Sequence, residues 1–374
     1  MTSQHIPITD LGKEYTQLRG EIDPALQRIL SSGSYILGSE TQAFEKELAA
    51  YGQSRHAIGV NSGTDAILLA LRALDVGPGD EVIVPAMTFM GTAEPVALLG
   101  AKPVFADIDP VSYTLDPAKA AKKINSRTKA IIAVHLYGQS ADLNELGRIA
   151  AKAKVPLIED MAQAIGSEYE GKKIGSFGAI SCLSFFPTKN LGACGDGGAL
   201  LTSSDDLADR LRALRNHGAR IKYQHDEVGY NTRLDEIQSA ILRIKLKHLD
   251  AWNDRRRQLA RLYEKALEGI PIQRPKEIAG RKHIFHLYSI QSKRRDALKK
   301  HLESRGISTG LHYPAPLHLQ PAFASLGDKR GDYPASETLA ANTLSLPLYP
   351  HMSDEDVAYV SQAVREFFGT QAAS

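Results

Sequence analysis

The sequence predicts an α/β fold, with a mostly parallel sheet covered by helices on both faces and a smaller α+β domain at the C-terminal end. Three observations predict it. Short apolar runs alternate with amphipathic helical segments through the N-terminal part of the chain. The runs are apolar at successive positions, which is typical of strands buried on both faces. After about residue 254 the alternation gives way to a different order of strands and helices.

The first region is expected to supply the sheet and the helices that cover it. The segments that we interpret as buried strands are EVIVP (81–85), KPVFADI (102–108), KAIIAVHLYG (129–138), VPLIED (155–160), GAISCLSFF (178–186) and GGALLTS (197–203). Helical periodicity is found at 63–74, at 141–153 and over a long region from 233 to 269. In such sheets ligands bind at the carboxyl ends of the strands, so the side chains just after each strand are the first candidates for a site.

The second region is predicted as a separate, smaller domain. Its elements are a strand IFHLYSIQ (284–291), a helix RRDALKKHLESRG (294–306) and a last helix (353–368) that begins at the cap residue Ser353. We therefore expect a large domain over residues 1–254 and a small domain over residues 255–374.

Composition narrows the class of protein. The 374 residues carry a formal net charge of +2, with 43% hydrophobic and 24% charged residues, so neither nucleic acid nor a membrane surface is favoured as a partner. Two cysteines cannot form a disulfide framework, and no CxxC pair indicates a metal site. The polar N-terminus lacks the apolar core of a signal peptide, and no apolar run reaches the length of a membrane span. We expect a cytoplasmic enzyme.

One lysine lies in a setting that a surface lysine does not need. Lys189 is found in SFFPTKNLGACGDGGALL (184–201), on a glycine-rich connection between two predicted buried strands. An amine becomes a nucleophile at neutral pH only when burial or nearby positive charge lowers its pKa. The chemistry that most needs such a lysine is Schiff-base formation with a carbonyl, and pyridoxal phosphate (PLP) is the cofactor that uses it.

PLP has further requirements, and the chain offers a residue for each. A helix that begins at Gly63 and Thr64 presents free backbone N–H groups to a phosphate, although Ser62 or Thr64 in an ordinary helix cap explains the same pattern. The Ser184 hydroxyl is a second phosphate donor. Asp160, at the end of a strand, is the candidate partner of the ring nitrogen, with a solvated strand end as the alternative. Phe89 is the candidate for stacking on the ring.

Taken together, the motifs resemble those of the DegT/StrS-type aminotransferases. They are NSGTDA, PAMTFMGTAEPV, IEDMAQAIG, SFFPTKNLGACGDGGAL, GYNTRLDEIQSAIL and GLHYPAPLHLQPAF, and the resemblance extends from about residue 32 to the last helix. It implies a PLP enzyme of fold type I that acts on nucleotide-linked keto sugars. It also implies a large domain with a seven-stranded sheet, a small C-terminal domain, and a homodimer with active sites at the subunit interface.

The resemblance also implies roles for individual residues. Lys189 is implied as the Schiff-base lysine and proton carrier, and Asp160 as the partner of the pyridine nitrogen. The other implied cofactor-binding residues are Gly63, Thr64, Phe89, Gln163 and Ser184, with Asn231 reaching the phosphate from the neighbouring subunit. A lysine rather than a histidine favours transamination over dehydration. The GDGGA at 195–199 is similar to members that aminate C3, whereas C4 enzymes more often carry EGG.

On the substrate side the sequence leaves alternatives open. We expect L-glutamate as the amino donor and a UDP- or dTDP-linked keto sugar as the acceptor. Candidate residues are Tyr35, Arg233, His286, His312, Tyr313 and His318. Arg233 is a candidate for holding a carboxylate of the donor or of a uronic acid substrate, with a helix-surface ion pair as the alternative. Packing of a proline-rich loop is the alternative for His312 and Tyr313, and a satisfied core histidine is the alternative for His286.

Other functions remain to be weighed. A PLP-dependent dehydratase or desulfurase is less favoured, because Lys189 is retained and no catalytic cysteine loop is found. A non-catalytic PLP-binding regulator would keep the same cofactor residues. A dinucleotide-binding fold is excluded, because the glycines after Lys189 do not open a helix in the G-x-G-x-x-G spacing.

Overall fold

The computed structural model describes residues 5–369 and contains one large sheet. Its seven strands lie in the order β1-β9-β8-β5-β4-β2-β3. Their bounds are β1 His56–Val60, β2 Glu81–Pro85, β3 Lys102–Ala106, β4 Thr128–Val134, β5 Leu157–Asp160, β8 Ile180–Ser184 and β9 Gly198–Thr202. The six predicted strands are therefore all present, and β1 joins them as an edge strand that the sequence pattern did not indicate.

Only β9 runs against the other strands. It pairs antiparallel with both β1 and β8, while β8, β5, β4, β2 and β3 are parallel to one another. The carboxyl ends of the six parallel strands consequently lie at one edge of the sheet, together with the amino end of β9. This edge carries the segments that follow β1, β2, β4, β5 and β8, which positions the site.

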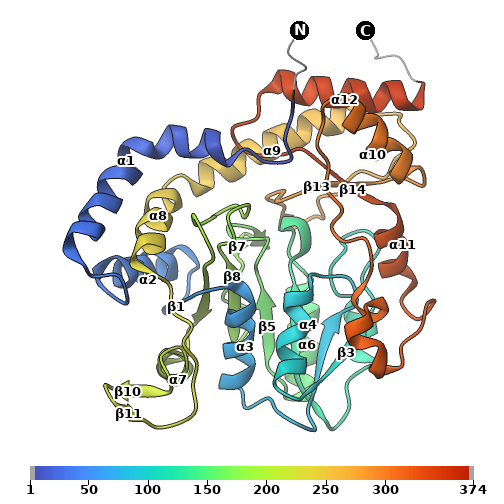
Figure 1. The fold of residues 1–374 in the computed structure, drawn as a ribbon. Helices are drawn as coiled ribbons and strands as arrows, with labels where there is room; N and C mark the ends of the chain where they lie inside the picture. Colours follow the sequence, from blue (N-terminus) through green and yellow to red (C-terminus); the bar gives the residue numbers. More distant parts are fainter. Residues whose placement is uncertain (1–4, 370–374) are drawn as a thin grey trace.

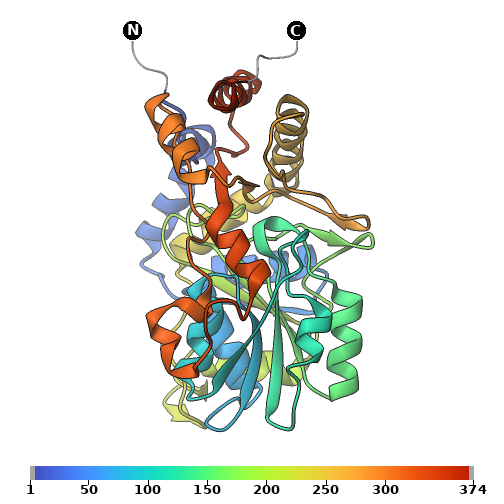
Figure 2. The same cartoon turned by 90° about the vertical axis from the view of Figure 1, so that its right-hand side faces the viewer.

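Helices cover both faces of the sheet (Figures 1 and 2). Alternate residues of β4 enter two different clusters, with Ala130 and Ile132 in one and Ile131 and Ala133 in the other. The first cluster includes residues of α3 Gly63–Ala73, α4 Met90–Leu98 and α7 Asp205–Leu214, and the second includes residues of α2 Ser39–Tyr51, α6 Leu143–Ala153 and α8 Glu236–Leu246. The predicted α/β sheet, buried on both faces, is confirmed.

A third cluster lies above the sheet, near both ends of the chain (Figure 1). Here β13 Tyr288–Gln291 pairs with β14 Thr343–Leu346. The helices packed around them are α9 Leu249–Ala266, α10 Arg295–Ser304 and α12 Asp354–Phe368. The helical region predicted over 233–269 is divided into α8 and α9, and α9 continues through residues 254 and 255.

The remaining elements extend this frame. Helix α1 Leu11–Ser32 packs its buried residues against α8 and Trp252. The shorter elements are α5 Pro117–Ala121, α11 Pro334–Asn342, β6 Glu168–Tyr169, β7 Lys172–Lys173, β10 Ala219–Ile221, β11 Gln224–His225 and β12 Arg281–Lys282, with 3-10 turns at Leu136–Gly138, Leu317–Leu319 and Pro321–Leu326. Within residues 5–369, no helix is long and apolar enough to cross a bilayer.

Candidate active site

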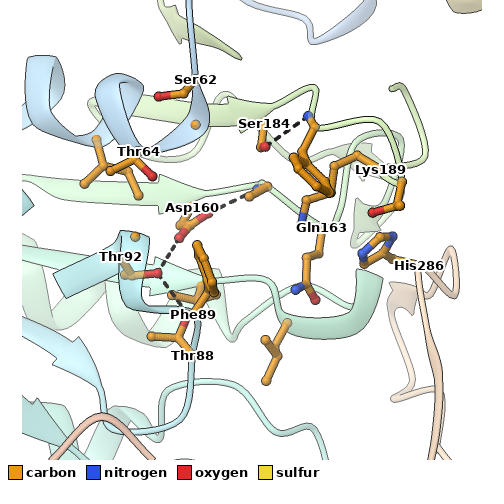
Figure 3. Close-up of a pocket in the computed structure, with 18 of the residues that line it drawn as sticks. Ser62, Thr64, Thr88, Phe89, Thr92, Asp160, Gln163, Ser184, Lys189 and His286 are labelled. Atoms are coloured by element: carbon orange, nitrogen blue, oxygen red, sulfur yellow. Dashed lines mark hydrogen bonds between the residues drawn. The ribbon is translucent and has the colours of Figure 1, made fainter. Parts of the chain in front are cut away.

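A cavity of about 450 Å³ opens at the carboxyl edge of the sheet (Figure 3). Its walls come from the segments after β1, β2, β4, β5 and β8, and from two segments near the third cluster. The lining residues that the sequence singled out are Gly63, Thr64, Phe89, Asp160, Gln163, Ser184, Lys189, His286, His312 and Tyr313. Residues far apart in the sequence are thus brought to one site by the parallel order of the strands.

The start of α3 forms one end of the cavity. Ser62 caps the helix by accepting from the Asp65 N–H at 3.0 Å, while Gly63 and Thr64, whose N–H groups have no partner within the helix, line the cavity. Gly63 lies against Ser184, and a Cβ placed on Gly63 would come within 2.6 Å of the Ser184 Cβ. Because only glycine permits this approach, the Ser184 hydroxyl lies beside the helix N-terminus. Together they form an anion-binding end.

The two carboxylates that end β5 point to opposite faces, because side chains alternate along a strand. Asp160 lines the cavity, accepting hydrogen bonds from the Thr92 hydroxyl at 2.8 Å and from the Ala162 N–H at 3.1 Å. The Thr88 and Thr92 hydroxyls are 2.9 Å apart. Both threonines line the cavity and were missed by the sequence analysis, although they are one helical turn apart just after β2.

Glu159 faces away from the cavity and is fully buried. Burial alone would raise its pKa, but a hydrogen bond from His135 and backbone N–H groups from the loop before β8 lower the pKa below its ordinary value. Glu159 therefore ties β5 to the segment that leads into β8, and so supports the position of the lysine loop.

Lys189 is partly buried in the tight loop between β8 and β9. Burial lowers the pKa of its amine to about 8, although the negative charge of Asp160 acts in the opposite direction. The loop is closed by hydrogen bonds from the Lys189 N–H to the Phe186 carbonyl at 2.8 Å and from the Ala193 N–H to the Phe185 carbonyl at 2.7 Å. The loop is thus closed around the lysine, and because of its lowered pKa a much larger share of the amine is neutral near pH 8 than for an ordinary lysine, as a nucleophile requires.

Gln163, Tyr313 and Phe89 form a connected wall. The Gln163 amide donates to the Tyr313 hydroxyl at 3.1 Å, and its oxygen accepts from the Tyr137 N–H at 2.8 Å. Burial and the charge of Asp160 raise the pKa of Tyr313, so its hydroxyl stays protonated. The Phe89 ring lies 5.7 Å from the Tyr313 ring, and Phe89 is 56% exposed at the cavity rim.

Two histidines also line the cavity. Burial and the nearby Lys189 lower the pKa of His312 to about 4, and they lower that of His286 well below its ordinary value. Both rings are therefore neutral at physiological pH. In Figure 3, Ser62 and Thr64 lie at one end of the cavity and His286 at the other.

Four sequence candidates lie outside this cavity. Tyr35 is exposed. The Arg233 guanidinium donates a hydrogen bond to the Asn216 side-chain oxygen at 3.2 Å. Asn231 is also exposed, and its backbone forms an antiparallel bridge with Asn216. His318 is buried against the Tyr333 ring, and its Nε2 lies 3.1 Å from a Glu337 carboxylate oxygen. The structure therefore does not bring His318 to the site, because its ring packs against Tyr333 and Glu337 instead.

The residues present fit PLP. A phosphate needs the N–H groups and hydroxyl at the α3 end, a protonated ring nitrogen needs a carboxylate, and the aldehyde needs an amine with a lowered pKa. The cavity provides all three, in Gly63 with Thr64 and Ser184, in Asp160 and in Lys189. Gly63 is the most telling, because a side chain there would fill the space between α3 and β8.

Comparison with known proteins agrees with this geometry. The model of the DegT/DnrJ/EryC1/StrS aminotransferase family matches residues 16–365. Among curated relatives, a pleiotropic regulatory protein of Geobacillus stearothermophilus is 48% identical over 97% of this chain and 99% of its own. A dTDP-3-amino-3,4,6-trideoxy-alpha-D-glucose transaminase of Streptomyces venezuelae is 47% identical over 97% and 96%. A UDP-N-acetyl-3-dehydro-alpha-D-glucosamine 3-aminotransferase of Acidithiobacillus ferrooxidans is 47% identical over 96% and 97%.

A solved structure extends the agreement to the fold. The crystal structure of S. venezuelae DesV in complex with a ketimine intermediate has 47% sequence identity and a TM-score of 0.95, and the match covers 97% of this chain and 98% of that one. The fold type I architecture implied by the sequence motifs is thus confirmed along nearly the whole chain. The chain belongs to the DegT/DnrJ/EryC1/StrS aminotransferase family and is a PLP-dependent aminotransferase.

Proposed function

We propose that this enzyme transfers an amino group from L-glutamate to the C3 ketone of a UDP- or dTDP-linked keto-hexose, in the biosynthesis of an amino sugar. The observation that carries the proposal is the Lys189 amine, with its pKa lowered to about 8, in one cavity with the Asp160 carboxylate. Two relatives whose names specify amination at C3 of a nucleotide sugar support the substrate, as does the GDGGA after the lysine.

Each end of the cavity has a part in holding the cofactor. We propose that Gly63, Thr64 and Ser184 bind the phosphate, Asp160 the ring nitrogen and Gln163 the phenolic oxygen, with Phe89 against the ring. PLP, when bound, supplies an electron sink for the negative charge that develops on the α-carbon of the donor. The hydrogen bonds from Thr92 and from the Ala162 N–H hold the Asp160 carboxylate in place, and a carboxylate beside the ring nitrogen would favour its protonated form.

Lys189 is the group that moves protons. Once its amine is free, Nζ takes the proton from the α-carbon of glutamate, and a pKa of about 8 places it close to the operating pH, where a general base is most effective. In the second half-reaction, Nζ returns a proton to the carbon of the sugar that was the ketone. One cavity thus serves two substrates in turn, which predicts ping-pong kinetics.

We propose further that the enzyme is a cytoplasmic homodimer, in which a second copy supplies Asn231, Tyr35 and Arg233 to each cavity. Large apolar side chains on the surface support this, with Tyr223 and Val228 each 84% exposed near Asn231 in the sequence. Mixing inactive Lys189→Ala and Asn231→Ala subunits tests the arrangement, since hybrid dimers would contain one intact site and regain activity. We also propose the two domains 1–254 and 255–374, supported by the separate cluster that, apart from Ile6, is formed by residues after 254.

An absorbance experiment tests the reaction. Purified protein loaded with PLP is expected to show a band near the visible edge that shifts to shorter wavelength on addition of L-glutamate. A panel of UDP- and dTDP-linked 3-keto and 4-keto sugars should then restore the band, with the 3-keto sugars effective. A band that ignores glutamate, or restoration by 4-keto sugars alone, would overturn the donor or the position of amination.

A second candidate is a PLP-binding regulator, which is favoured by the name of the Geobacillus stearothermophilus relative, a pleiotropic regulatory protein. A regulator would retain the cofactor residues without needing turnover. Steady release of an aminated sugar at catalytic protein concentrations would exclude a purely regulatory role, while a glutamate response without any turnover of the sugar panel would favour it.

A further inference from the structure

Three buried side chains connect the wall of the cavity to a backbone carbonyl behind it. The Asn253 amide donates to the Ile165 carbonyl at 3.1 Å, and the Asn190 amide donates to the Asn253 oxygen at 2.7 Å. The Asn190 oxygen lies 2.9 Å from Nδ1 of His286. We call these three hydrogen bonds the relay. Gly166 leaves room for the relay, because a Cβ on Gly166 would come within 2.6 Å of the Asn253 amide nitrogen.

The direction of every bond in the relay follows from its far end. A carbonyl oxygen can only accept, so the Asn253 side chain must present its NH₂ group to Ile165 and its oxygen to Asn190. Asn190 must then present its own oxygen to His286. Because this oxygen accepts, Nδ1 of His286 must carry the proton. The relay therefore fixes one tautomer of the neutral ring, with Nδ1 protonated and Nε2 bare.

The bare nitrogen of His286 has no protein partner. Within residues 5–369, no hydrogen bond is made by Nε2, although His286 is only 6% exposed and lines the cavity. Burial, Lys189 and Arg256 lower the pKa of the ring, so Nε2 stays an acceptor at physiological pH. An unpartnered acceptor in a buried wall is costly unless a ligand or water supplies a donor.

The other wall histidine does not share this property. Nδ1 of His312 lies 2.8 Å from the Ser345 hydroxyl, which in turn lies 2.8 Å from the Ser289 hydroxyl. Hydroxyls rotate and can donate or accept, so this network is compatible with either tautomer of His312. Of the two histidines, only His286 therefore has a tautomer fixed by its hydrogen bonds, with Nε2 as the acceptor.

Position and charge indicate which substrate the acceptor serves. His286 lies at the opposite end from Ser62 and Thr64, where we place the phosphate (Figure 3). A neutral acceptor gives nothing to the carboxylates of glutamate, which need donors, and the amino group of glutamate is the group that is transferred, whereas a sugar has several hydroxyl groups that are free to donate. We propose that Nε2 of His286 accepts a hydrogen bond from a hydroxyl of the keto sugar, and so acts as a specificity residue for the second half-reaction. This inference rests on the proposed function.

The tautomer is tested first, on the full-length protein with ¹⁵N-labelled histidine. The signals of His286 are identified among the 12 histidines by their loss in His286→Asn. NMR distinguishes a protonated ring nitrogen from a bare one, and the expected result is a protonated Nδ1 and a bare Nε2 at neutral pH. A protonated Nε2 would overturn the inference whatever reaction the enzyme catalyses.

The role is tested by measuring the two half-reactions separately. In His286→Asn the amide can replace the Nδ1 donor to Asn190 but has no group at the Nε2 position. The KM for the keto sugar is expected to rise about threefold to tenfold, the range for one lost hydrogen bond, with little change for glutamate. In His286→Gln the amide oxygen reaches the Nε2 position and should recover part of the loss. His283→Asn changes a buried histidine outside the cavity and should alter neither half-reaction.

Monodeoxy sugar substrates identify the donor. The analogue without the relevant hydroxyl should lose affinity for the wild-type enzyme but no further affinity for His286→Asn. Two results would overturn the assignment and leave the aminotransferase reaction intact. One is that His286→Asn impairs the half-reaction with glutamate as much as the half-reaction with the keto sugar. The other is that every deoxy analogue loses as much affinity for His286→Asn as for the wild-type enzyme. If wild-type enzyme accepts no keto sugar at all, the proposed function fails, and the role of His286 fails with it.

Discussion

Thr92 offers a sharp test of how the site holds the cofactor's acidic partner. Thr92 is 2% exposed, and its hydroxyl donates to Asp160 at 2.8 Å. Since that proton is used on the carboxylate, the contact with Thr88, at 2.9 Å, must be donated by the Thr88 hydroxyl. Thr92→Val keeps the shape of the side chain and removes both bonds. Asp160 then retains the Ala162 N–H as its donor.

The expected magnitude follows from the charge of the acceptor. A hydrogen bond to a charged group contributes about 1.5–3 kcal/mol to stability, and a bond between neutral hydroxyls about 1 kcal/mol. Thr92→Val should therefore reduce the free energy of unfolding by about 2 kcal/mol or more. Thr88→Val removes only the bond between hydroxyls and should cost about 1 kcal/mol, which makes it the matched control.

The assay is a double-mutant cycle measured by urea unfolding. It combines Thr92→Val with Asp160→Asn, which removes the charge while keeping the size. A coupling energy of about 1.5 kcal/mol between the two positions is expected. A coupling below about 0.5 kcal/mol, or an equal cost for Thr88→Val and Thr92→Val, would refute the reasoning that Thr92 acts by stabilising the charge of Asp160.

Three further predictions concern the surroundings of the cavity. Gly63→Ala places a Cβ 2.6 Å from the Ser184 Cβ, and in an equilibrium titration it should weaken PLP binding at least tenfold, which is about 1.4 kcal/mol. The control is Gly147→Ala, which adds a Cβ in open space on α6. This variant should bind PLP normally and gain about 0.5–1 kcal/mol of stability. Lys189→Met removes a buried amine whose pKa is about 8, so the cofactor-free variant should have a larger free energy of unfolding than wild type at pH 7. This difference in stability should narrow as the pH rises above 8, because the unfolded wild-type chain then binds more protons than the native one. A difference that does not depend on pH would contradict the lowered pKa. Glu159→Gln should cost about 3 kcal/mol at pH 7, because a buried charge with several donors is lost. Since the pKa of Glu159 is lowered in the fold, this advantage of the wild type is present above the ordinary glutamate pKa and should disappear in acid unfolding titrations below it.

Much of the fold was predictable because buried parallel strands have a strong sequence pattern. The strand that was missed, β1, has the sequence HAIGV, in which His56 and Gly59 interrupt the apolar run, and it pairs with β9, which is distant in the sequence. The reversed direction of β9 was equally invisible, since an apolar run indicates burial but not orientation. The break between α8 and α9 also escaped, because helical periodicity continues through it.

The site was predictable where a residue type has an unusual setting. Lys189 on a glycine-rich loop and Asp160 at a strand end indicated their chemistry, and both line the cavity. The supporting residues could not be found in this way. Thr92 and Asn190 are ordinary polar residues, whose importance lies in which atoms they meet across the fold. The direction of the relay to His286 depends on a carbonyl far from it in sequence.

The pairing of β1 with β9 also has a consequence for how the enzyme forms. His56 is paired with Thr202, so the edge strand β1 joins the sheet only when it meets β9, and the other five strands of the sheet lie between these two in the sequence. The anion-binding end of the cavity follows β1 directly, and the lysine loop directly precedes β9. Contacts of such high sequence separation form slowly during folding, because loop closure must precede them. The phosphate end and the lysine loop are therefore held at one edge of the sheet only once β9 has been made and has paired with β1, so cofactor binding depends on a contact between distant segments of the chain.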